Sequence, residues 1–376
     1  MSRRLRLVAL LALAVVVILL YATRIRREMI DFTTWRQMTV RALHAEPLYR
    51  VEDGHYQFKY LPLFAVIMAP FGLIELEIGK ALWFAISIGL LVLVMRWSVS
   101  ALPDRRLPRA TLGALAVVLM AKFLAHELLL GQVNLLLGAL LLAALVSVQM
   151  KRPNAAGALV GAAAFVKPYA LILLPWLLVT QGWRAAGTAA GTVIVGLFLP
   201  ALVYGWNGNL DLLRAWLDTV TQSTTPNLLG NDNVSIASMW AKWLGPGPTA
   251  TLLTFATFAS VGMLVILVWR RRRAVAAPEY LECALLMLLI PLISPQGWDY
   301  VLLLATPAVV CLVDRWRDLT RIWQGALAVA LVTMCLTIFD LMGRSLYGRF
   351  MSLALVSVAG LAVAVGLVHT RWRALA

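Results

Sequence analysis

Apolar runs of about 20 residues recur from one end of the chain to the other, and this repetition constrains the fold more than any other feature. Each run is long enough to cross a hydrocarbon core of about 30 Å as an α-helix. Charged residues make up only 14% of the chain, whereas a soluble domain carries about 25%. The sequence therefore predicts an all-α polytopic membrane protein, with residues 1–376 forming a single integral membrane domain.

We predict helices wherever these apolar runs occur. The first run follows Arg3, Arg4 and Arg6 as a signal peptide would, but it lacks a small-x-small cleavage site, so we expect an uncleaved helix. Residues 154–181 carry Lys167-Pro168 in the middle, which predicts a hairpin of two short helices. With that hairpin the chain has about 12 spans, the others being expected at 5–21, 79–96, 110–127, 131–150, 184–204, 249–269, 279–293, 298–313, 321–340 and 350–369.

The net charge of +15 raises the possibility of nucleic-acid binding. The basic residues, however, sit in short clusters between the apolar runs, where Lys and Arg mark the cytoplasmic loops of a membrane protein. This placement excludes nucleic acid as a partner and puts both termini in the cytoplasm. The predicted cytoplasmic clusters are Arg3/4/6, Arg96/105/106/109, Lys151/Arg152, Arg184, Arg270 to Arg273, Arg315/317/321 and Arg371/373.

The polar loops lie on the opposite, outer side of the predicted bilayer. Segment 60–74 is apolar but short and interrupted by Pro62 and Pro70, so we expect it to be interfacial or re-entrant. Loops carry function disproportionately, which favours an active site on this side. The outer loops are expected at 22–59, 205–248, 294–298 and 341–349.

The first outer loop contains a pattern typical of an amphipathic helix. Phe32, Trp35 and Met38 recur at helical spacing among polar residues, which predicts a helix that lies on the membrane surface. Asp31 stands at its start. It is either an N-cap, which Asp favours, or a catalytic carboxylate, and the two roles are compatible.

Further polar groups interrupt or adjoin the apolar runs. Lys167 is an intramembrane lysine, expensive to bury and a functional candidate, unless it snorkels to the outer surface. Asp232, Asn233 and Ser235 fit an ordinary polar turn or, as Asn-Val-Ser, a glycosylation acceptor. Trp298 and Tyr300 fit an interfacial aromatic belt, and Asp299 between them fits a helix cap. The scattered Cys and His predict no disulfide framework, metal site or cofactor.

In this order, the pieces resemble the polyprenyl-phosphate-dependent membrane glycosyltransferases of the GT-C class, specifically glycosyltransferase family 87, which includes mycobacterial phosphatidylinositol mannoside mannosyltransferases. The resemblance covers most of the chain, and its motifs are specific only as an ordered set. The matching residues are Asp31-Phe32, Pro47-Leu-Tyr49, Tyr60-Leu-Pro62-Leu-Phe64 with Pro70, Gly131-Gln132-Val-Asn134, Lys167-Pro-Tyr169, Asn233-Val-Ser235 and Ser294-Pro-Gln-Gly-Trp298.

The resemblance implies an inverting transfer of a hexose or pentose, such as mannose, from a polyprenyl-phosphate donor to a glycolipid or glycan acceptor. It would occur at the outer face of the bacterial inner membrane. Asp31 matches the general base, and the phosphate would be bound by a cation, with Lys167, Lys59 and Arg344 as candidates. We expect Tyr60 and Tyr169 beside the sugar donor. The cavity and acceptor residues are expected to be Gln132, Asn134, Asn233, Ser235, Trp298 and Asp299.

One departure from the family pattern and two alternative functions remain open. Family members often follow the Ser-Pro-x-x-Trp motif with histidines, but here Asp299-Tyr300 follows, which leaves the sugar, the acceptor and any His-based role undetermined. A transporter or flippase would also fit the many spans and a buried lysine, although we find no two-fold repeat of broken helices. A non-catalytic scaffold would be favoured by the absence of a cavity beside Asp31 and Lys167.

Overall fold

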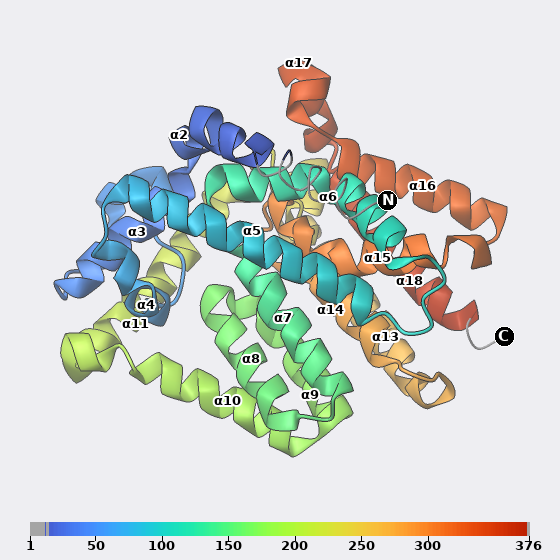
Figure 1. The fold of residues 1–376 in the computed structure, drawn as a ribbon, viewed down its shortest axis with the longest axis horizontal. Helices are drawn as coiled ribbons and strands as arrows, with labels where there is room; N and C mark the ends of the chain where they lie inside the picture. The colour runs from blue at the N-terminus through green and yellow to red at the C-terminus, as the bar shows by residue number, and fades with distance from the viewer. Residues whose placement is uncertain (1–11, 13–14, 374–376) are drawn as a thin grey trace.

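The structure, a computed structural model, describes residue 12 and residues 15–373. Most of the first predicted span, 5–21, lies outside the described residues, as do Arg3, Arg4, Arg6 and both chain ends. Every regular element among the described residues is a helix (Figure 1). The β-type pairing found among these residues is an isolated bridge between Asn233 and Trp298. The predicted all-α fold class is confirmed.

Among the described residues, four long apolar helices can cross a membrane by length and composition alone. Each begins within a few residues of a span that the sequence predicts, and their exposed faces carry large apolar side chains such as Val92, Val118 and Phe255. These helices are α5 (Leu76–Ser100), α6 (Arg109–Leu130), α13 (Pro248–Arg270) and α18 (Leu355–Arg373).

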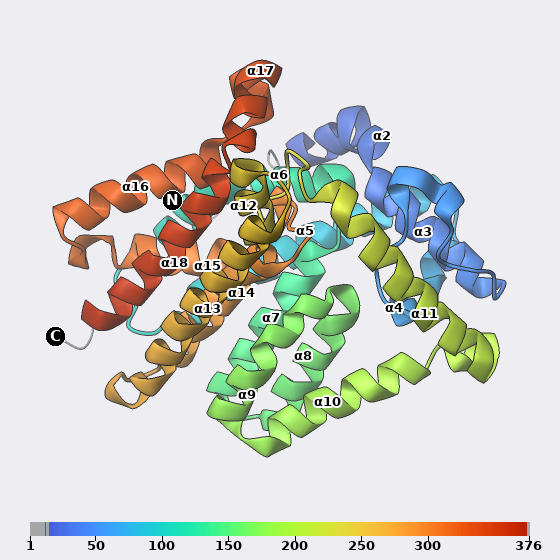
Figure 2. The ribbon, with the colours of Figure 1, turned by 180° about the vertical axis from the view of Figure 1, so that it is seen from behind.

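Two predicted spans bend sharply. Helix α10 (Trp183–Phe198) turns by 90° into α11 (Ala201–Asn227), and α16 (Arg321–Leu336) turns by 104° into α17 (Phe339–Ser352). At the first bend Pro200 supplies no backbone N–H to continue the helix, and Gly205 shortly after it is non-helical with φ +70°. At the second, Ile338 is extended and Gly343 is non-helical with φ +71°. Helix α11 consequently runs from α10 back towards α12 (Ile236–Leu244), as Figure 2 shows. If each bent pair is one span, the number of candidate spans rises to 6.

The remaining helices of the bundle are shorter. Helix α14 coincides with the predicted span 279–293, whereas the predicted helix 298–313 begins as the 3₁₀ segment η6. Nearly all residues of α14 are buried, so this helix lies at the centre of the bundle. The shorter elements are α7 (Asn134–Gln149), α8 (Pro153–Val166), η4 (Pro168–Ile172), α9 (Leu173–Gln181), η5 (Arg272–Ala274), α14 (Glu279–Ile293), η6 (Asp299–Ala305), α15 (Thr306–Asp314) and η7 (Trp316–Asp318).

The predicted hairpin over 154–181 is confirmed. Lys167 is an extended residue between α8 and η4–α9, where Pro168 begins the second arm. Helix α8 packs closely on α10, because Gly157 and Gly161 leave room for its backbone. A Cβ atom at Gly157 would lie 2.2 Å from the carbonyl oxygen of Ala185. These small residues therefore fix the hairpin against the rest of the bundle.

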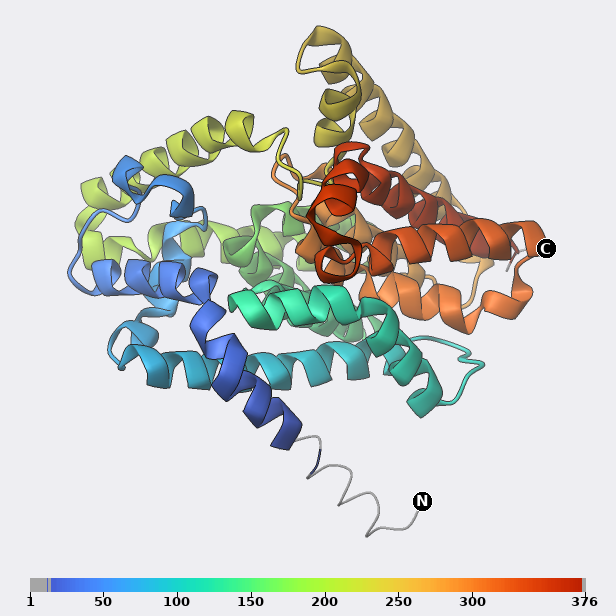
Figure 3. The ribbon, with the colours of Figure 1, turned by 90° about the horizontal axis from the view of Figure 1, so that it is seen from above.

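The elements before α5 form a layer at one end of the molecule, beside α11 (Figures 1 and 3). The predicted amphipathic helix is present as α3, but Phe32, Trp35 and Met38 are buried within the protein rather than turned to a membrane surface. Segment 60–74 forms two helices of 6 and 4 residues, too short to cross a bilayer. The elements of this layer are η1 (Tyr21–Ile25), α2 (Arg26–Glu28), α3 (Ile30–Leu43), η2 (Val51–Tyr56), α4 (Pro62–Ile67) and η3 (Ala69–Gly72).

The basic loops meet at the other end of the bundle. Asp314 accepts hydrogen bonds from the backbone N–H groups of Arg106 and Leu107, so the loops that follow α5 and α15 are joined. The side chain of Gln149, at the end of α7, donates to the carbonyl of Ala101 in the same loop. Because α7 begins at the polar residue Asn134 and ends here, the basic loops and the polar loops lie at opposite ends of the helices.

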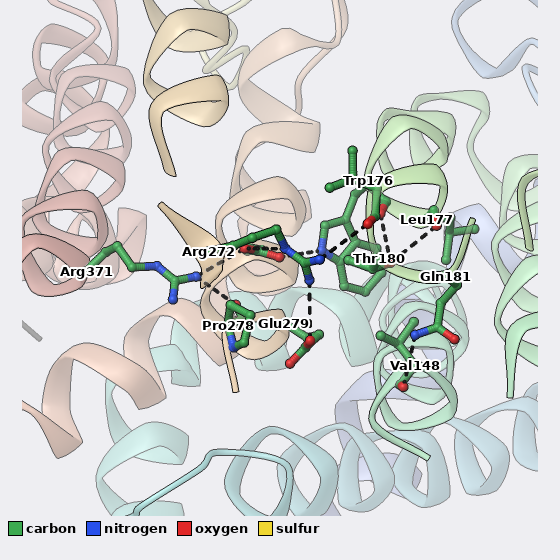
Figure 4. Close-up of polar contacts among 11 residues, drawn as sticks. Val148, Trp176, Leu177, Thr180, Gln181, Arg272, Pro278, Glu279 and Arg371 are labelled. Carbon is green, nitrogen blue, oxygen red and sulfur yellow. Dashed lines mark hydrogen bonds and ion pairs between the residues drawn. The ribbon is translucent and has the colours of Figure 1, made fainter. Parts of the chain in front are cut away.

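A buried ion-pair network also lies at this basic end (Figure 4). The Glu282 carboxylate lies 3.4 Å from Arg272 Nε and 3.3 Å from Arg371 Nη2, and its other oxygen accepts from Trp176 Nε1 at 3.1 Å. Arg272 also contacts Glu279 at 3.3 Å. Glu282 therefore joins η5, α9, α14 and α18.

Candidate functional site

A cavity of about 960 Å³ opens at the end opposite the basic loops. It lies between α3, the loop residues 56–60, the end of α6, the tip of the hairpin, α11 and the loop 294–300. Asp31 and Lys167 both line it, so the observation that would favour a scaffold does not hold. The predicted site residues in its lining are Asp31, Lys59, Tyr60, Gln132, Lys167, Tyr169 and Trp298.

Asp31 reaches the cavity because α3 packs tightly on the end of α6. The indole N–H groups of Trp35 and Trp83 donate to the carbonyl of Gly131 at 3.3 and 3.1 Å. Gly131 has φ +67°, and a Cβ atom there would lie 2.7 Å from Phe32 Cβ. Only glycine fits this approach at low cost. It brings the next residue, Gln132, against Asp31.

Gln132 holds the Asp31 carboxylate in place. Its Nε2 donates to Asp31 Oδ2 at 2.7 Å and to the hydroxyl of Tyr300 at 3.2 Å, while the Tyr60 hydroxyl donates to its Oε1 at 3.5 Å. Helix α3 itself is preceded by Met29 at the N-cap position, and no side chain caps it. The N-cap interpretation of Asp31 is therefore wrong, because its side chain turns to Gln132.

Lys59 enters the cavity from the first loop. Its ammonium donates to Gln296 Oε1 at 2.8 Å and lies 6.0 Å from the centre of the Trp298 ring. The Trp216 indole donates to the carbonyl of Lys59 at 3.0 Å, which ties this loop to α11. Burial lowers the pKa of Lys59, and the opposing effect of Asp31 is the smaller one.

An ion pair between α3 and η2 fixes the loop that carries Lys59. Arg41 of α3 donates to both oxygens of Asp53 at 2.6 and 2.7 Å, and both side chains are largely buried. Two parallel N–H···O bonds give this pair a fixed geometry. The 3₁₀ segment η2 is thereby anchored to α3 only a few residues before the cavity.

Lys167 lines the cavity from the break of the hairpin, where it is half-buried near Glu127 and Asp31. Glu127 was not predicted. It is fully buried and accepts from Asn134 Nδ2 and from the backbone N–H of Leu135, both at 2.8 Å. A glutamate at the end of an apolar run, just before Gly131-Gln132, is the signal that could have identified it.

Several predicted residues lie outside the cavity lining, because other contacts occupy their side chains. Asn134 binds Glu127. Asn233 donates to the carbonyls of Asn227 and Pro295 at 3.0 and 2.9 Å and accepts from the N–H of Ser235, whose own hydroxyl caps α12. Asp299 is fully buried beside Lys122, so its interpretation as a helix cap is wrong.

Arg344, the third candidate for the phosphate, also lies outside the lining, as an exposed residue of α17. Conversely, α11 supplies a wall that the sequence did not predict. One face of this helix brings Trp216, Val220 and three threonines to the cavity. Their spacing of three to four residues is the signal that could have identified the wall. The threonines are Thr221, Thr224 and Thr225.

Comparisons with known proteins point to one family. Residues 58–295 match the family model described as glycosyltransferase family 87. The chain is 26% identical over 335 residues, 80% of its length, to a protein of Mycolicibacterium smegmatis, of which 73% is covered. That protein is a polyprenol-phosphate-mannose-dependent alpha-(1-2)-phosphatidylinositol mannoside mannosyltransferase. No solved structure matches the chain.

Proposed function

Because the chain belongs to glycosyltransferase family 87 and is a membrane glycosyltransferase, we propose that it moves a sugar from a polyprenyl-phosphate donor to a lipid or glycan acceptor. The sugar is mannose or another hexose or pentose, and the acceptor is a glycolipid by analogy with the relative. The observation that carries this proposal is that the Asp31 carboxylate and two lysines, Lys59 and Lys167, line one cavity.

Asp31 is the general base of the proposed reaction. The acceptor hydroxyl loses its proton as it attacks the anomeric carbon, and a carboxylate within hydrogen-bond reach takes it. Gln132 supports this role because it fixes one carboxylate oxygen, Oδ2, at 2.7 Å. The polyprenyl phosphate leaves from the opposite face of the sugar, so the anomeric carbon is inverted.

Lys59 and Lys167 bind the leaving phosphate. Its charge develops as the glycosidic bond breaks, and fixed cations at that point stabilise the transition state. Both lysines line the cavity that Asp31 lines, whereas Arg344 does not, so we place the phosphate at the two lysines.

We place the cavity on the outer side of the inner membrane. It lies at the end of the helices opposite the basic loops around Arg106 and Arg272, and such loops face the cytoplasm. Nucleotide sugars are cytoplasmic, so an outer site fits a lipid-carried sugar. We also propose that the short helices α7, α8, α9 and α14, the segment η6–α15 and the predicted first span 5–21 cross the bilayer with the six longer candidates, for about 12 spans in all.

Sugar transfer can be tested directly with the purified protein in liposomes. We expect radiolabelled mannose to move from polyprenol-phosphate-mannose to a phosphatidylinositol mannoside, and the labelled glycolipid to be detected by chromatography and mass spectrometry. A parallel sample without acceptor is the control. Translocation of intact labelled donor without a new glycolipid would instead support a transporter.

The lowered pKa of Lys59 predicts a dependence of donor binding on pH. The ammonium attracts the phosphate and is lost as the pH rises through the pKa of Lys59, which burial places below that of an ordinary lysine. The KM for the sugar donor should therefore rise at alkaline pH. In Lys59→Arg the charge at position 59 persists, so the donor KM should rise less between about pH 7 and pH 10 than it does in the wild type. An equal rise in both proteins would show that another group titrates.

A further inference from the structure

The cavity has a second polar region that the proposed chemistry does not use. Tyr300 marks the boundary, because its hydroxyl accepts from Gln132, while the edge of its ring meets His126 with the ring centres 5.3 Å apart. His126, which lies beside Tyr300, and Asp232 also line the cavity, and these two residues define what we call the region beyond Tyr300. Neither was predicted from the sequence as a cavity residue.

A buried ion pair lies beside His126. Asp299 has a fully buried carboxylate, and its Oδ2 lies 2.8 Å from Lys122 Nζ. The other oxygen, Oδ1, lies 3.9 Å from His126 Nδ1. Lys122 and His126 are four residues apart on α6, so they share one face of that helix. With Nδ1 turned to Asp299, the imidazole keeps Nε2 for a ligand.

Two hydrogen bonds hold Asp232 in place. Its carboxylate accepts from the Tyr347 hydroxyl at 2.7 Å, and its backbone carbonyl accepts from the N–H of Asp299 at 2.8 Å. Lys242 lies close by, but its ammonium donates to the carbonyls of Asn231 and Asn233 at 3.0 and 2.8 Å. One carboxylate oxygen of Asp232 thus remains for a ligand.

The charges that reach the cavity differ between its two regions. Around Asp31, the ammonium groups of Lys59 and Lys167 form an arrangement that suits a phosphate. Beyond Tyr300, Lys122 is occupied by Asp299, so a ligand there meets the carboxylate of Asp232 and the imidazole of His126. A carboxylate repels a phosphate but accepts hydrogen bonds from hydroxyl groups. The region beyond Tyr300 therefore suits an uncharged sugar.

We propose that His126 and Asp232 form the subsite for the sugar hydroxyls of the acceptor, and that the Lys122–Asp299 pair positions His126 there. This inference rests on the proposed function. Inversion requires the acceptor and the leaving phosphate on opposite sides of the anomeric carbon. Gln132 joins Asp31 to Tyr300, so the base and this subsite are connected by one hydrogen-bond network. His126 and Asp232 contact the substrate, whereas Asp299 and Lys122 act through His126.

Steady-state kinetics with polyprenol-phosphate-mannose as donor and a phosphatidylinositol mannoside as acceptor test the subsite. We expect His126→Gln and Asp232→Asn each to raise the KM for the acceptor about 10- to 100-fold, the value of a charge-assisted hydrogen bond. The KM for the donor should stay within about twofold. Asp211→Asn, which alters an exposed carboxylate of α11, should change neither constant.

The results separate the two proposals. Loss of donor affinity in His126→Gln, or an unchanged acceptor KM in both variants, would overturn the subsite while transfer by the wild type still supports the function. Failure of the wild-type protein to transfer mannose would overturn the function itself.

A double-mutant cycle tests whether Asp299 positions His126. We expect Asp299→Asn to raise the acceptor KM about tenfold alone, and to add little in the His126→Gln background. Lys122→Arg, which keeps the cation, should retain the wild-type acceptor KM. Equal effects of Asp299→Asn in both backgrounds, with a lowered melting temperature, would mean a structural role and overturn the positioning. If Asp299→Asn does not fold, the same cycle is run with Lys122→Met.

Discussion

Asp31→Asn is expected to lower kcat for sugar transfer by about 10²- to 10⁴-fold, the contribution of a positioned general base. The amide has nearly the same shape, so it still packs beside Gln132, but it takes no proton from the acceptor hydroxyl. The KM for the sugar donor should change little, because the lysines bind the phosphate. The measurement is the initial rate of mannose transfer in liposomes at saturating donor and acceptor.

Two controls make this result specific to Asp31. Asp211→Asn makes the same chemical change at an exposed carboxylate with 72% side-chain exposure, and it should leave kcat unchanged. The melting temperature of Asp31→Asn should equal that of the wild type, because Asp31 caps no helix. A variant that folds and retains wild-type turnover would remove Asp31 from the role of base.

Glu282→Gln is expected to cost about 3–5 kcal/mol of unfolding free energy, the typical loss when one partner of a buried ion pair is removed. The glutamine still accepts the hydrogen bond from Trp176, but the 2%-exposed guanidinium of Arg371 loses its counter-charge. Arg272 loses one of its two carboxylate partners. Reversible unfolding in mixed detergent micelles, followed by tryptophan fluorescence, measures the change.

Glu279→Gln is the matched control. Glu279 contacts the same Arg272 at 3.3 Å, but its side chain is 24% exposed, and within the described part of the chain it forms an ion pair with no other arginine. The loss should therefore stay below about 1 kcal/mol, as for a surface pair. Equal losses in the two variants would show that the buried position of Glu282 does not matter. Sugar transfer at low temperature should survive in both, because the network lies at the end of the bundle opposite the cavity.

The helices and several cavity residues followed from local patterns. The apolar run 279–293 is α14, and Lys167-Pro168 divides a hairpin, because a proline and a charge interrupt a helix wherever they occur. Asp31 and Gln132 are polar residues beside predicted helices that the family resemblance assigned to the site, and they meet in the cavity. Such residues stand out because burying a polar group in a membrane is expensive.

The choice of which polar side chains face the cavity did not follow from such patterns. In the sequence, nothing distinguishes Asn233 and Asp299 from Gln132 as candidate cavity residues. In the structure one binds the backbone of the neighbouring loop and the other pairs with Lys122, 177 residues earlier by their numbers. The α11 wall was missed for the same reason, since it depends on a bend of 90° that turns a polar helix back over the site.

Composition, charge placement and residue order alone predicted a helical membrane protein with its polar loops at one end. They could do so because the length of an apolar run and the charge of a loop are properties of one short segment. The meeting of Asp31, Lys59, Lys167 and His126 around one hollow came from packing between distant helices. Small residues such as Gly131 and Gly157 permit that packing, but which surfaces they bring together depends on contacts with partners far away in the chain. The residue pattern of one segment does not identify the distant residues that the segment contacts.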